Sequence, residues 1–222
     1  MKINAIITGT TGMVGKAVLL ECLEHPQVES VLIINRVTIR LTHPKLTELL
    51  HTNFFDLTAI KEQLKGYDSC FFCLGVSSMG MNESDYHKYT YELTTNFANT
   101  FLEQNPVSRF IYVSGAGTDS SEKGKIMWAR VKGKTENAIF NMGFKNAYAF
   151  RPGMILPEKG VKSKVKLYNF LYLVFSPFNF LFRKMKSVTT SSRLGQAMIN
   201  AVLKGSNKLH LENEDINLLA KA

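Results

Sequence analysis

The amino-acid sequence predicts an α/β fold: a doubly wound parallel sheet with helices on both faces and a small C-terminal lid region. Up to residue 153, short apolar runs alternate with longer segments of helical periodicity. Strands that alternate with helices form βαβ units, and their right-handed crossovers cover both faces of a parallel sheet. The first apolar run also ends in a glycine-rich turn that leads directly into a helical segment, as in sheets of this class that bind phosphates.

Each element is predicted from its own local pattern. Strands are expected where apolar runs of strand length end near a glycine or a polar residue, at 3–9, 30–36, 46–54, 68–75, 108–115 and 146–153. Helices are expected where apolar positions recur at helical spacing, at 13–24, 57–66, 84–104, 126–142 and 189–207. In the last helix Ser191 or Ser192 is a candidate N-cap, and Gly205 is expected to end it.

Length and composition predict one domain. The 222 residues fit a single domain over 1–222, in which 154–222 forms a C-terminal substrate or lid portion. Hydrophobic residues make up 45% of the chain and charged residues 20%, which is typical of a globular protein with a substantial core. The net charge of +9 favours anionic partners, which include phosphorylated cofactors, nucleic acid and acidic membrane surfaces.

Cysteine and histidine spacing predicts neither a disulfide framework nor a metal site. The chain has three cysteines, an odd number, and its N-terminal stretch does not have the form of a secretory signal peptide. Cys70 and Cys73 are spaced as C-x-x-C within the apolar run SCFFCLG, but side chains three residues apart on a strand point to opposite faces. The histidines follow no metal-binding spacing. From these features we expect a cytoplasmic protein.

The turn TGTTGMVG carries glycines at G-x-x-G-x-x-G spacing between the first strand and the first helix. Such glycines allow a tight turn, a close approach of the backbone to a pyrophosphate, and close packing of helix on strand. Free N–H groups and the positive end of the helix dipole then face the phosphates. The turn therefore predicts an NAD(P)-binding Rossmann fold, with cofactor contacts from Gly9, Thr11, Gly12, Met13, Val14 and Gly15.

The end of the second strand indicates which dinucleotide is bound. A carboxylate at this place usually binds the ribose hydroxyls of NAD, but here the strand ends in Asn35 and Arg36. A guanidinium can hold a phosphate through two charge-assisted hydrogen bonds. The sequence therefore predicts NADP(H) in preference to NAD(H), with Arg36 at the 2′-phosphate. Arg40 either assists or is a solvated loop charge.

Several motifs together resemble those of the short-chain dehydrogenase/reductase superfamily. They are TGTTGMVG, INR, NFFDL, FCLG, YVSGAG, VKGKTEN and FRPG, all within residues 3–153. The chain is most similar to the extended or atypical branch, which includes nucleotide-sugar epimerases and Tat-interacting oxidoreductase-like proteins. These motifs are specific for fold and cofactor and say little about the substrate.

The resemblance implies a role for individual residues along the cofactor. Asp56 and Leu57 would border the adenine, and Leu74 and Gly75 would follow the ribose and pyrophosphate. Ser114 matches the serine that hydrogen-bonds the reacting oxygen of the substrate. Lys132 matches the lysine that binds the nicotinamide ribose and lowers the pKa of a catalytic tyrosine. Arg151 and Pro152 would close over the nicotinamide end.

Trp128 departs from the family pattern, because it stands where the superfamily has its catalytic tyrosine, four residues before Lys132. An indole N–H donates a hydrogen bond but does not titrate near neutral pH. The loss of a positioned general acid typically costs on the order of 10²–10⁴-fold in rate. Trp128 either stacks beside the nicotinamide or fills the space of the tyrosine. Other candidate acids are Tyr86, His87, Tyr89, Tyr91 and Tyr112, each of which packing also explains.

The segment 162–186 is basic and aromatic. An apolar block is flanked by lysines and arginine and is interrupted by Pro177, so it is too short for a membrane-spanning helix. Three roles remain open: a hydrophobic roof over the substrate, a weak membrane-surface contact, or a homodimer contact. Nucleic-acid binding is disfavoured because the aromatic residues are not interleaved with the basic ones.

Three functions follow. The first is an NADP(H)-dependent oxidoreductase of the atypical short-chain class that acts on a small or hydrophobic carbonyl or hydroxyl compound, with Ser114, Lys132 and Trp128 at the reacting end. The second is a non-catalytic sensor or interaction protein whose partner affinity depends on NADP(H). The third is isomerase or epimerase chemistry on a nucleotide-linked sugar, which ranks last because it ordinarily uses the same tyrosine.

Overall fold

The computed structural model describes residues 2–161 and 185–222, and their core is a seven-stranded parallel sheet. The strand order is β3-β2-β1-β4-β5-β6-β9, and every neighbouring pair is parallel. The strands are β1 (Ile3–Thr8), β2 (Val28–Asn35), β3 (Leu46–Leu50), β4 (Ser69–Phe72), β5 (Arg109–Val113), β6 (Asn146–Arg151) and β9 (His210–Glu212). The predicted α/β class with a parallel sheet is confirmed.

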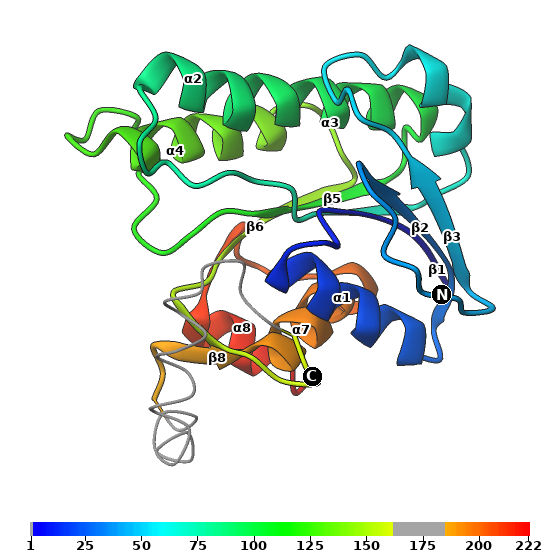
Figure 1. Cartoon of the computed structure of the whole chain (residues 1–222). Coiled ribbons are helices and arrows are strands. Elements are labelled where there is room, and N and C mark those ends of the chain that lie inside the picture. Colours follow the sequence, from blue (N-terminus) through cyan, green and yellow to red (C-terminus); the bar gives the residue numbers. More distant parts are fainter. Residues whose placement is uncertain (1, 162–184) are drawn as a thin grey trace.

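Helices cover both faces of this sheet (Figure 1). One face carries α1 (Met13–Glu24), α7 (Ser191–Lys204) and α8 (Asn213–Leu219). The other carries α2 (Glu83–His87), α3 (Leu93–Gln104) and α4 (Met127–Phe140). A π-helical turn, Lys88–Glu92, joins α2 to α3, and a short 3₁₀ helix, Thr58–Leu64, precedes β4.

Alternation along the central strands produces two separate cores. Ile7 packs with Val18 and Leu19 of α1 on one face, whereas Ile6 packs with Phe72 and Phe97 on the other. All six of these side chains are completely buried or nearly so. The same alternation separates the C-x-x-C cysteines, as predicted, because Cys70 and Cys73 pack against opposite cores.

The predicted strands and helices all occur, but four short C-terminal elements had no sequence prediction. They are β7 (Met154–Leu156), β8 (Val188–Thr190), β9 and α8. β7 and β8 pair in parallel as a separate two-stranded sheet. Strands of three residues are too short to show an alternating pattern of apolar and polar residues. The sequence of this part of the chain therefore does not reveal its strands.

The N-cap of α7 is a correction to the sequence prediction. Thr190, which precedes both predicted candidates, accepts a hydrogen bond from the backbone N–H of Arg193. Ser191 instead accepts one from the backbone N–H of Glu158. Gly205 ends the helix as expected, with a φ of 77° that favours glycine at this position.

The basic aromatic segment 162–186 lies almost entirely outside the described residues. Its three possible roles therefore stay predictions. In the described part of the chain, 2–161 and 185–222, no helix has the length and apolar character needed to cross a membrane.

Candidate functional site

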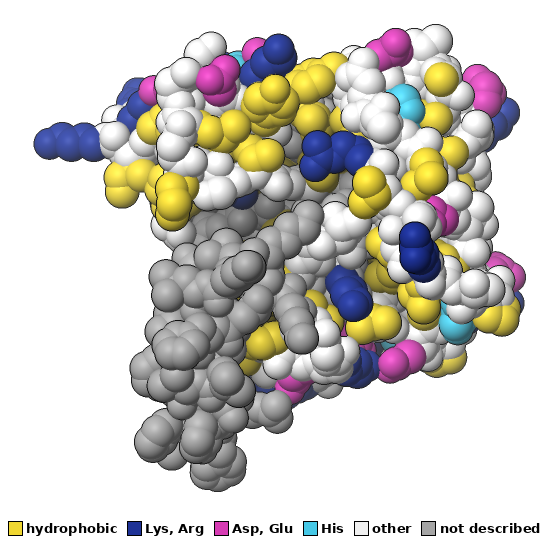
Figure 2. All heavy atoms as spheres, in the orientation of Figure 1, with side chains coloured by type: hydrophobic (Ala, Val, Ile, Leu, Met, Phe, Trp, Pro, Cys, Tyr) yellow, Lys and Arg dark blue, Asp and Glu magenta, His cyan; other side chains and the backbone are white. Residues whose placement is uncertain are grey.

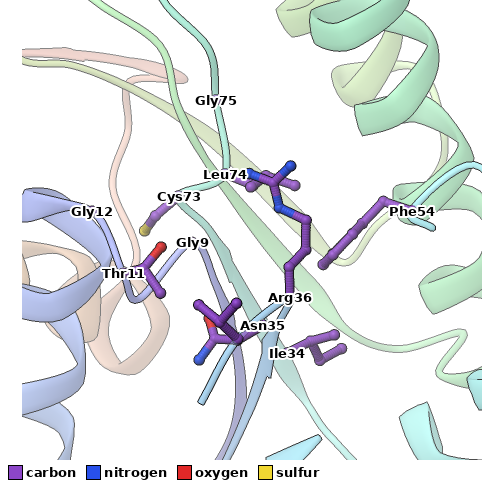
Figure 3. Close-up of a pocket in the computed structure, with 11 residues that line it drawn as sticks. Gly9, Thr11, Gly12, Ile34, Asn35, Arg36, Phe54, Cys73, Leu74 and Gly75 are labelled. Carbon is purple, nitrogen blue, oxygen red and sulfur yellow. The ribbon is translucent and has the colours of Figure 1, made fainter. Parts of the chain in front are cut away.

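A cavity of about 460 Å³ opens at the carboxyl ends of β1, β2 and β4. β1 lies between β2 and β4, so the cavity occupies the point where the strand order reverses, which is where open parallel sheets bind their ligands. It is lined by Gly9, Thr11, Gly12, Ile34, Asn35, Arg36, Val37, Phe54, Cys73, Leu74 and Gly75. Figure 3 shows the glycine turn on one side of this cavity and Arg36 and Phe54 on the other.

The glycines of the turn bring backbone close to the cavity. A Cβ atom on Gly9 would lie 2.6 Å from the carbonyl oxygen of Cys73, and the φ of Gly9 is 72°. A Cβ on Gly15 would lie 2.4 Å from the carbonyl oxygen of Gly9. Both positions therefore require glycine, and α1 begins at Met13 directly beside the cavity. This is the cradle that a pyrophosphate needs at a helix N-terminus.

The two residues after Gly12 belong to the core and not to the cavity wall. Met13 and Val14 are half-buried and pack against the core shared by β1 and α1, and neither side chain lines the cavity. Their contribution to a bound cofactor is limited to the backbone N–H groups of the first helical turn.

Arg36 is the one cationic side chain that lines the cavity in the described residues, and no Asp or Glu lines it there. Its side chain extends from the end of β2 across the cavity toward Leu74 (Figure 3). The guanidinium has no ion pair with any described residue. It is exposed and can therefore meet an anionic ligand.

Asn35 and the loop after it are held by Glu48. The Asn35 side chain accepts a hydrogen bond from the Thr10 hydroxyl (2.9 Å) and donates one to Glu48 (3.2 Å). The Glu48 carboxylate also accepts from the hydroxyl of Thr38 and the N–H of Ile39. Desolvation would raise the pKa of Glu48, but these hydrogen bonds outweigh it and lower that pKa. Glu48 therefore holds the loop that carries Arg36 in place. The side chain of Asn35 has a structural role, because it is hydrogen-bonded to Thr10 and Glu48.

A smaller cavity of about 120 Å³ adjoins the first and shares Arg36, Phe54, Leu74 and Gly75 with it. Its other lining residues include Phe55 and Tyr89, whose rings meet edge to face with centroids 5.8 Å apart. Flat aromatic faces beside a guanidinium can accept a planar base. Phe54 and Phe55 were not among the predicted site residues, although the motif NFFDL contains both.

Asp56 and Leu57, expected beside the adenine, do not line either cavity. Asp56 accepts a hydrogen bond from the N–H of Thr58 at the start of the 3₁₀ helix, and Leu57 is buried in the core. The cavity wall at this place is built by the aromatic residues that precede them.

The structure brings Ser114 and Lys132 together at the end of β5. The ammonium nitrogen of Lys132 donates to the carbonyl oxygen of Ser114 (3.2 Å) and lies 5.4 Å above the ring centroid of Tyr112. The Ser114 Oγ lies 2.9 Å from Oγ1 of Thr118. Since Phe72 of β4 pairs with Tyr112 of β5, Ser114 follows one strand over from the Leu74 edge of the cavity.

The surroundings of Lys132 perturb its protonation. Burial lowers its pKa to about 8, and the nearby carboxylate of Glu136 opposes that shift only in part. The ammonium is therefore close to releasing its proton near neutral pH, which is unusual for a lysine.

Trp128 lies on α4 one turn before Lys132 and is half-buried. Its ring packs on the loop between β5 and α4, because a Cβ on Gly117 would lie 3.6 Å from its Cη2 atom. The alignment of Trp128, Lys132 and Glu136 along one face follows from their spacing of four residues.

Of the other candidate acids, none lines the main cavity in the described chain. Tyr86 and Tyr112 are buried, and burial raises the pKa of each phenol. Tyr91 packs against His87 at a centroid distance of 4.7 Å and lies under Lys134. Tyr89 borders only the smaller cavity.

Arg151 does not direct its guanidinium to the cavity. Its Nε donates to Oε1 of Glu136 at 3.0 Å, its Nη2 pairs with Oε2 of the same carboxylate, and its Nη1 lies 3.6 Å from Glu212. The carbonyl oxygen of Pro152 accepts a hydrogen bond from the N–H of Ala116. Arg151 also donates from Nη2 to the hydroxyl of Ser120, so both residues fix the loop after β5, which follows Ser114.

The fold and the glycine turn define an α/β protein of the class that binds nicotinamide dinucleotides. The family model described as NAD(P)H-binding matches residues 9–148, and the chain belongs to this family. The resemblance to the short-chain dehydrogenase/reductase superfamily is confirmed.

The chain is similar to curated proteins in sequence and to solved structures in fold. The chain is 26% identical over 163 residues to the protein fmp52, mitochondrial, of Emericella nidulans, covering 70% of this chain and 68% of that protein. It resembles the Bordetella bronchiseptica enzyme WbmH in complex with NAD⁺, with a TM-score of 0.65, 18% identity and coverage of 91% of this chain and 72% of that one. It also resembles a UDP-glucose 4-epimerase from Thermotoga maritima, with a TM-score of 0.68, 14% identity and coverage of 99% and 82%.

The expected cytoplasmic location is contradicted by the relatives. The similar proteins from Emericella nidulans, Debaryomyces hansenii and Neurospora crassa are all named as mitochondrial. Cysteine usage does not distinguish between compartments inside the cell.

Proposed function

We propose that the chain is an NADP(H)-dependent oxidoreductase of the atypical short-chain class, acting on a small or hydrophobic carbonyl or hydroxyl compound. The observation that carries the proposal is the cavity between the glycine turn and Arg36, which has a cation and no described carboxylate in its wall. A 2′-phosphate carries negative charge that Arg36 can meet with two hydrogen bonds.

The residues of the site fit such a cofactor along its length. Backbone N–H groups after Gly12 would hold the pyrophosphate, Arg36 the 2′-phosphate, and Phe54 a face of the adenine. Lys132 and Ser114 lie one strand beyond, where Lys132 would contact the nicotinamide ribose and Ser114 the reacting oxygen of the substrate. A bound reduced nicotinamide would supply hydride to the substrate carbon.

Arg36 offers the sharpest test. Arg36→Ala should weaken NADPH binding by about ten- to a hundredfold, since hydrogen bonds to charged groups contribute roughly 1.5–3 kcal/mol. NADH, which lacks the 2′-phosphate, should bind almost as before. Arg36→Asp should reverse the preference. Binding is measured by calorimetry, and in parallel by quenching of Trp128, the only tryptophan, with energy transfer to the reduced nicotinamide.

The matched control is Lys65→Ala, which removes the same charge from an exposed position that lies before β4, away from the carboxyl ends of the strands. It should leave both affinities unchanged. Equal losses for NADPH in both variants would mean that net charge, not a phosphate contact, governs binding. An unchanged preference in Arg36→Asp would refute the assignment of NADP(H).

A non-catalytic sensor is the second candidate, and the indole packed against Gly117 at the tyrosine position favours it. In this case cofactor occupancy would alter the affinity for a protein partner. Pull-downs with and without NADPH test this function: partners that change with NADPH support it, and identical partners oppose it. Epimerase chemistry ranks third, as the same tyrosine is ordinarily required for it.

A further inference from the structure

The residue at the family's tyrosine position, Trp128, leaves the candidate site without its usual proton donor. Reduction of a carbonyl needs a proton for the oxygen as hydride reaches the carbon. Trp128 cannot provide one, and the described wall of the cavity offers only the Cys73 thiol as a titratable group besides Arg36. Burial raises the pKa of that thiol far above neutrality, so neither group is a useful acid.

The Lys132 ammonium lies at the end of β5 and carries a proton that it can donate. Its nitrogen donates to the carbonyl oxygens of Ser114 and Val113, at 3.2 and 3.5 Å, and so stays at the end of β5. An ammonium group has three donor hydrogens, and these two contacts leave one that can be directed to a ligand.

The hydroxyl of Ser114 is arranged to support this geometry. Thr118 Oγ1 donates its single hydrogen to the carbonyl oxygen of Gly115 at 2.8 Å, so the contact of 2.9 Å between Ser114 and Thr118 has Ser114 as donor. The Ser114 hydroxyl can rotate to donate to a substrate carbonyl oxygen instead, while its lone pairs stay available as acceptors. A product hydroxyl can donate to these lone pairs once its oxygen has been protonated.

We infer that Lys132 donates the proton to the reacting oxygen of the substrate, in place of the phenol that related enzymes use. The inference rests on the proposed oxidoreductase function. As the carbonyl carbon gains hydride from a reduced nicotinamide, the π-electron pair of the C=O bond moves to oxygen. That oxygen forms an O–H bond with a proton from Nζ, which leaves a neutral amine that solvent reprotonates.

The charged and aromatic groups around Lys132 agree with this role. Tyr112 of β5 presents its ring face to Nζ, and its own phenol is buried. Glu136, one turn further along α4, is completely buried and is engaged by Arg151 of β6 and by His210 of β9 at 3.3 Å. Because Arg151 also pairs with the Glu136 carboxylate, Glu136 stabilises the Lys132 ammonium only in part. The resulting pKa of about 8 suits a general acid near neutral pH.

The first test measures the pKa of the Lys132 ammonium directly, in the NADPH complex. Protein with ¹³C at the lysine ε-carbons is titrated by NMR, and Lys132→Arg assigns the resonance. Lys132 is expected to titrate near pH 8, well below the usual range of a lysine. Titration together with the surface lysines would overturn the inference without affecting cofactor binding.

The second test follows NADPH oxidation with 9,10-phenanthrenequinone as the carbonyl probe. The wild-type rate should fall as the pH rises through 8, because the neutral amine has no proton to give. Lys132→Arg keeps the positive charge but cannot release a proton, so kcat should fall by about 10²–10⁴-fold while NADPH still binds. Trp128→Tyr supplies a phenol and should move the falling limb to higher pH. Lys134→Arg, two residues along α4 and beside His87, should behave as wild type.

The outcomes separate the two proposals. Turnover that survives in Lys132→Arg, with only KM changed, would leave Lys132 as a ribose contact and refute its role as acid. Absence of turnover in wild type and in Trp128→Tyr, with NADPH bound to both, would refute the oxidoreductase function itself and with it any proton donation.

Discussion

At the scale of single residues, Gly15 has the least room of the three glycines in the turn. A Cβ there would lie 2.4 Å from the carbonyl oxygen of Gly9, so Gly15→Ala must push α1 away from β1. We expect a loss of about 1–3 kcal/mol in the free energy of unfolding, as is typical of overpacking. NADPH affinity should fall at least tenfold, since the cradle moves with the helix.

Gly115→Ala is the control for this substitution, because a Cβ at Gly115 meets nothing within 4 Å. Urea denaturation and calorimetry of both variants measure the two effects. A Gly15→Ala protein as stable as Gly115→Ala would show that the turn can open without cost, which would remove the packing argument for this glycine.

Residue positions were more predictable than residue partners. Ser114 and Lys132 could be brought together from sequence, because one follows a strand and the other lies at the helical spacing of a motif. The fate of Arg151 could not, because its partner Glu136 lies on a different element and only the folded sheet brings the two together. In the same way, nothing in NFFDL indicates that the aromatic pair, not Asp56, reaches the cavity.

At the scale of elements, α7 depends on its N-cap at Thr190. The Thr190 hydroxyl accepts from the N–H of Arg193 at 3.2 Å, and loss of such a cap typically costs about 1 kcal/mol. Thr190→Ala should therefore lower the urea midpoint with an unchanged m-value. Ser192→Ala, two residues on, should have an effect below about 0.5 kcal/mol. Equal destabilisation by both variants would mean that Thr190 contributes through its burial in β8 and not as a cap.

The type of an element could be predicted from sequence where its pattern was long, and could not where its pattern was short. The helices 13–24 and 126–142 and the apolar strands each carry enough residues for their periodicity to be recognised. β7 and β8 are three residues each, and their pairing joins positions more than thirty residues apart. Such a pairing depends on tertiary contacts that local sequence does not encode.

At the scale of the whole molecule, a buried ion pair connects α4 with the strands at the β9 edge of the sheet. Glu136 of α4 is completely buried and binds Arg151 of β6, and His210 of β9 lies against the same carboxylate. Arg151 also reaches Ser120 in the loop after β5. This network ties a helix, two strands and the loop below Trp128 into one unit.

Removing one partner should therefore cost more than removing both. Glu136→Gln leaves the Arg151 guanidinium buried without its carboxylate, which typically costs about 3–5 kcal/mol. Glu136→Leu/Arg151→Met removes both charges and should recover much of that loss. A double-mutant cycle, with Arg151→Met and Glu136→Leu as its single variants, measures the coupling by urea denaturation.

The same cycle separates stability from chemistry. Because Glu136 supports the ammonium of Lys132, its removal should lower the pKa of Lys132 further. The falling limb of the rate with phenanthrenequinone should move to lower pH in the double variant, even where stability has returned. Additive effects on stability would show that Glu136 and Arg151 act independently. A restored stability with an unmoved pH limb would show that the network supports the fold alone and that Lys132 is tuned by burial.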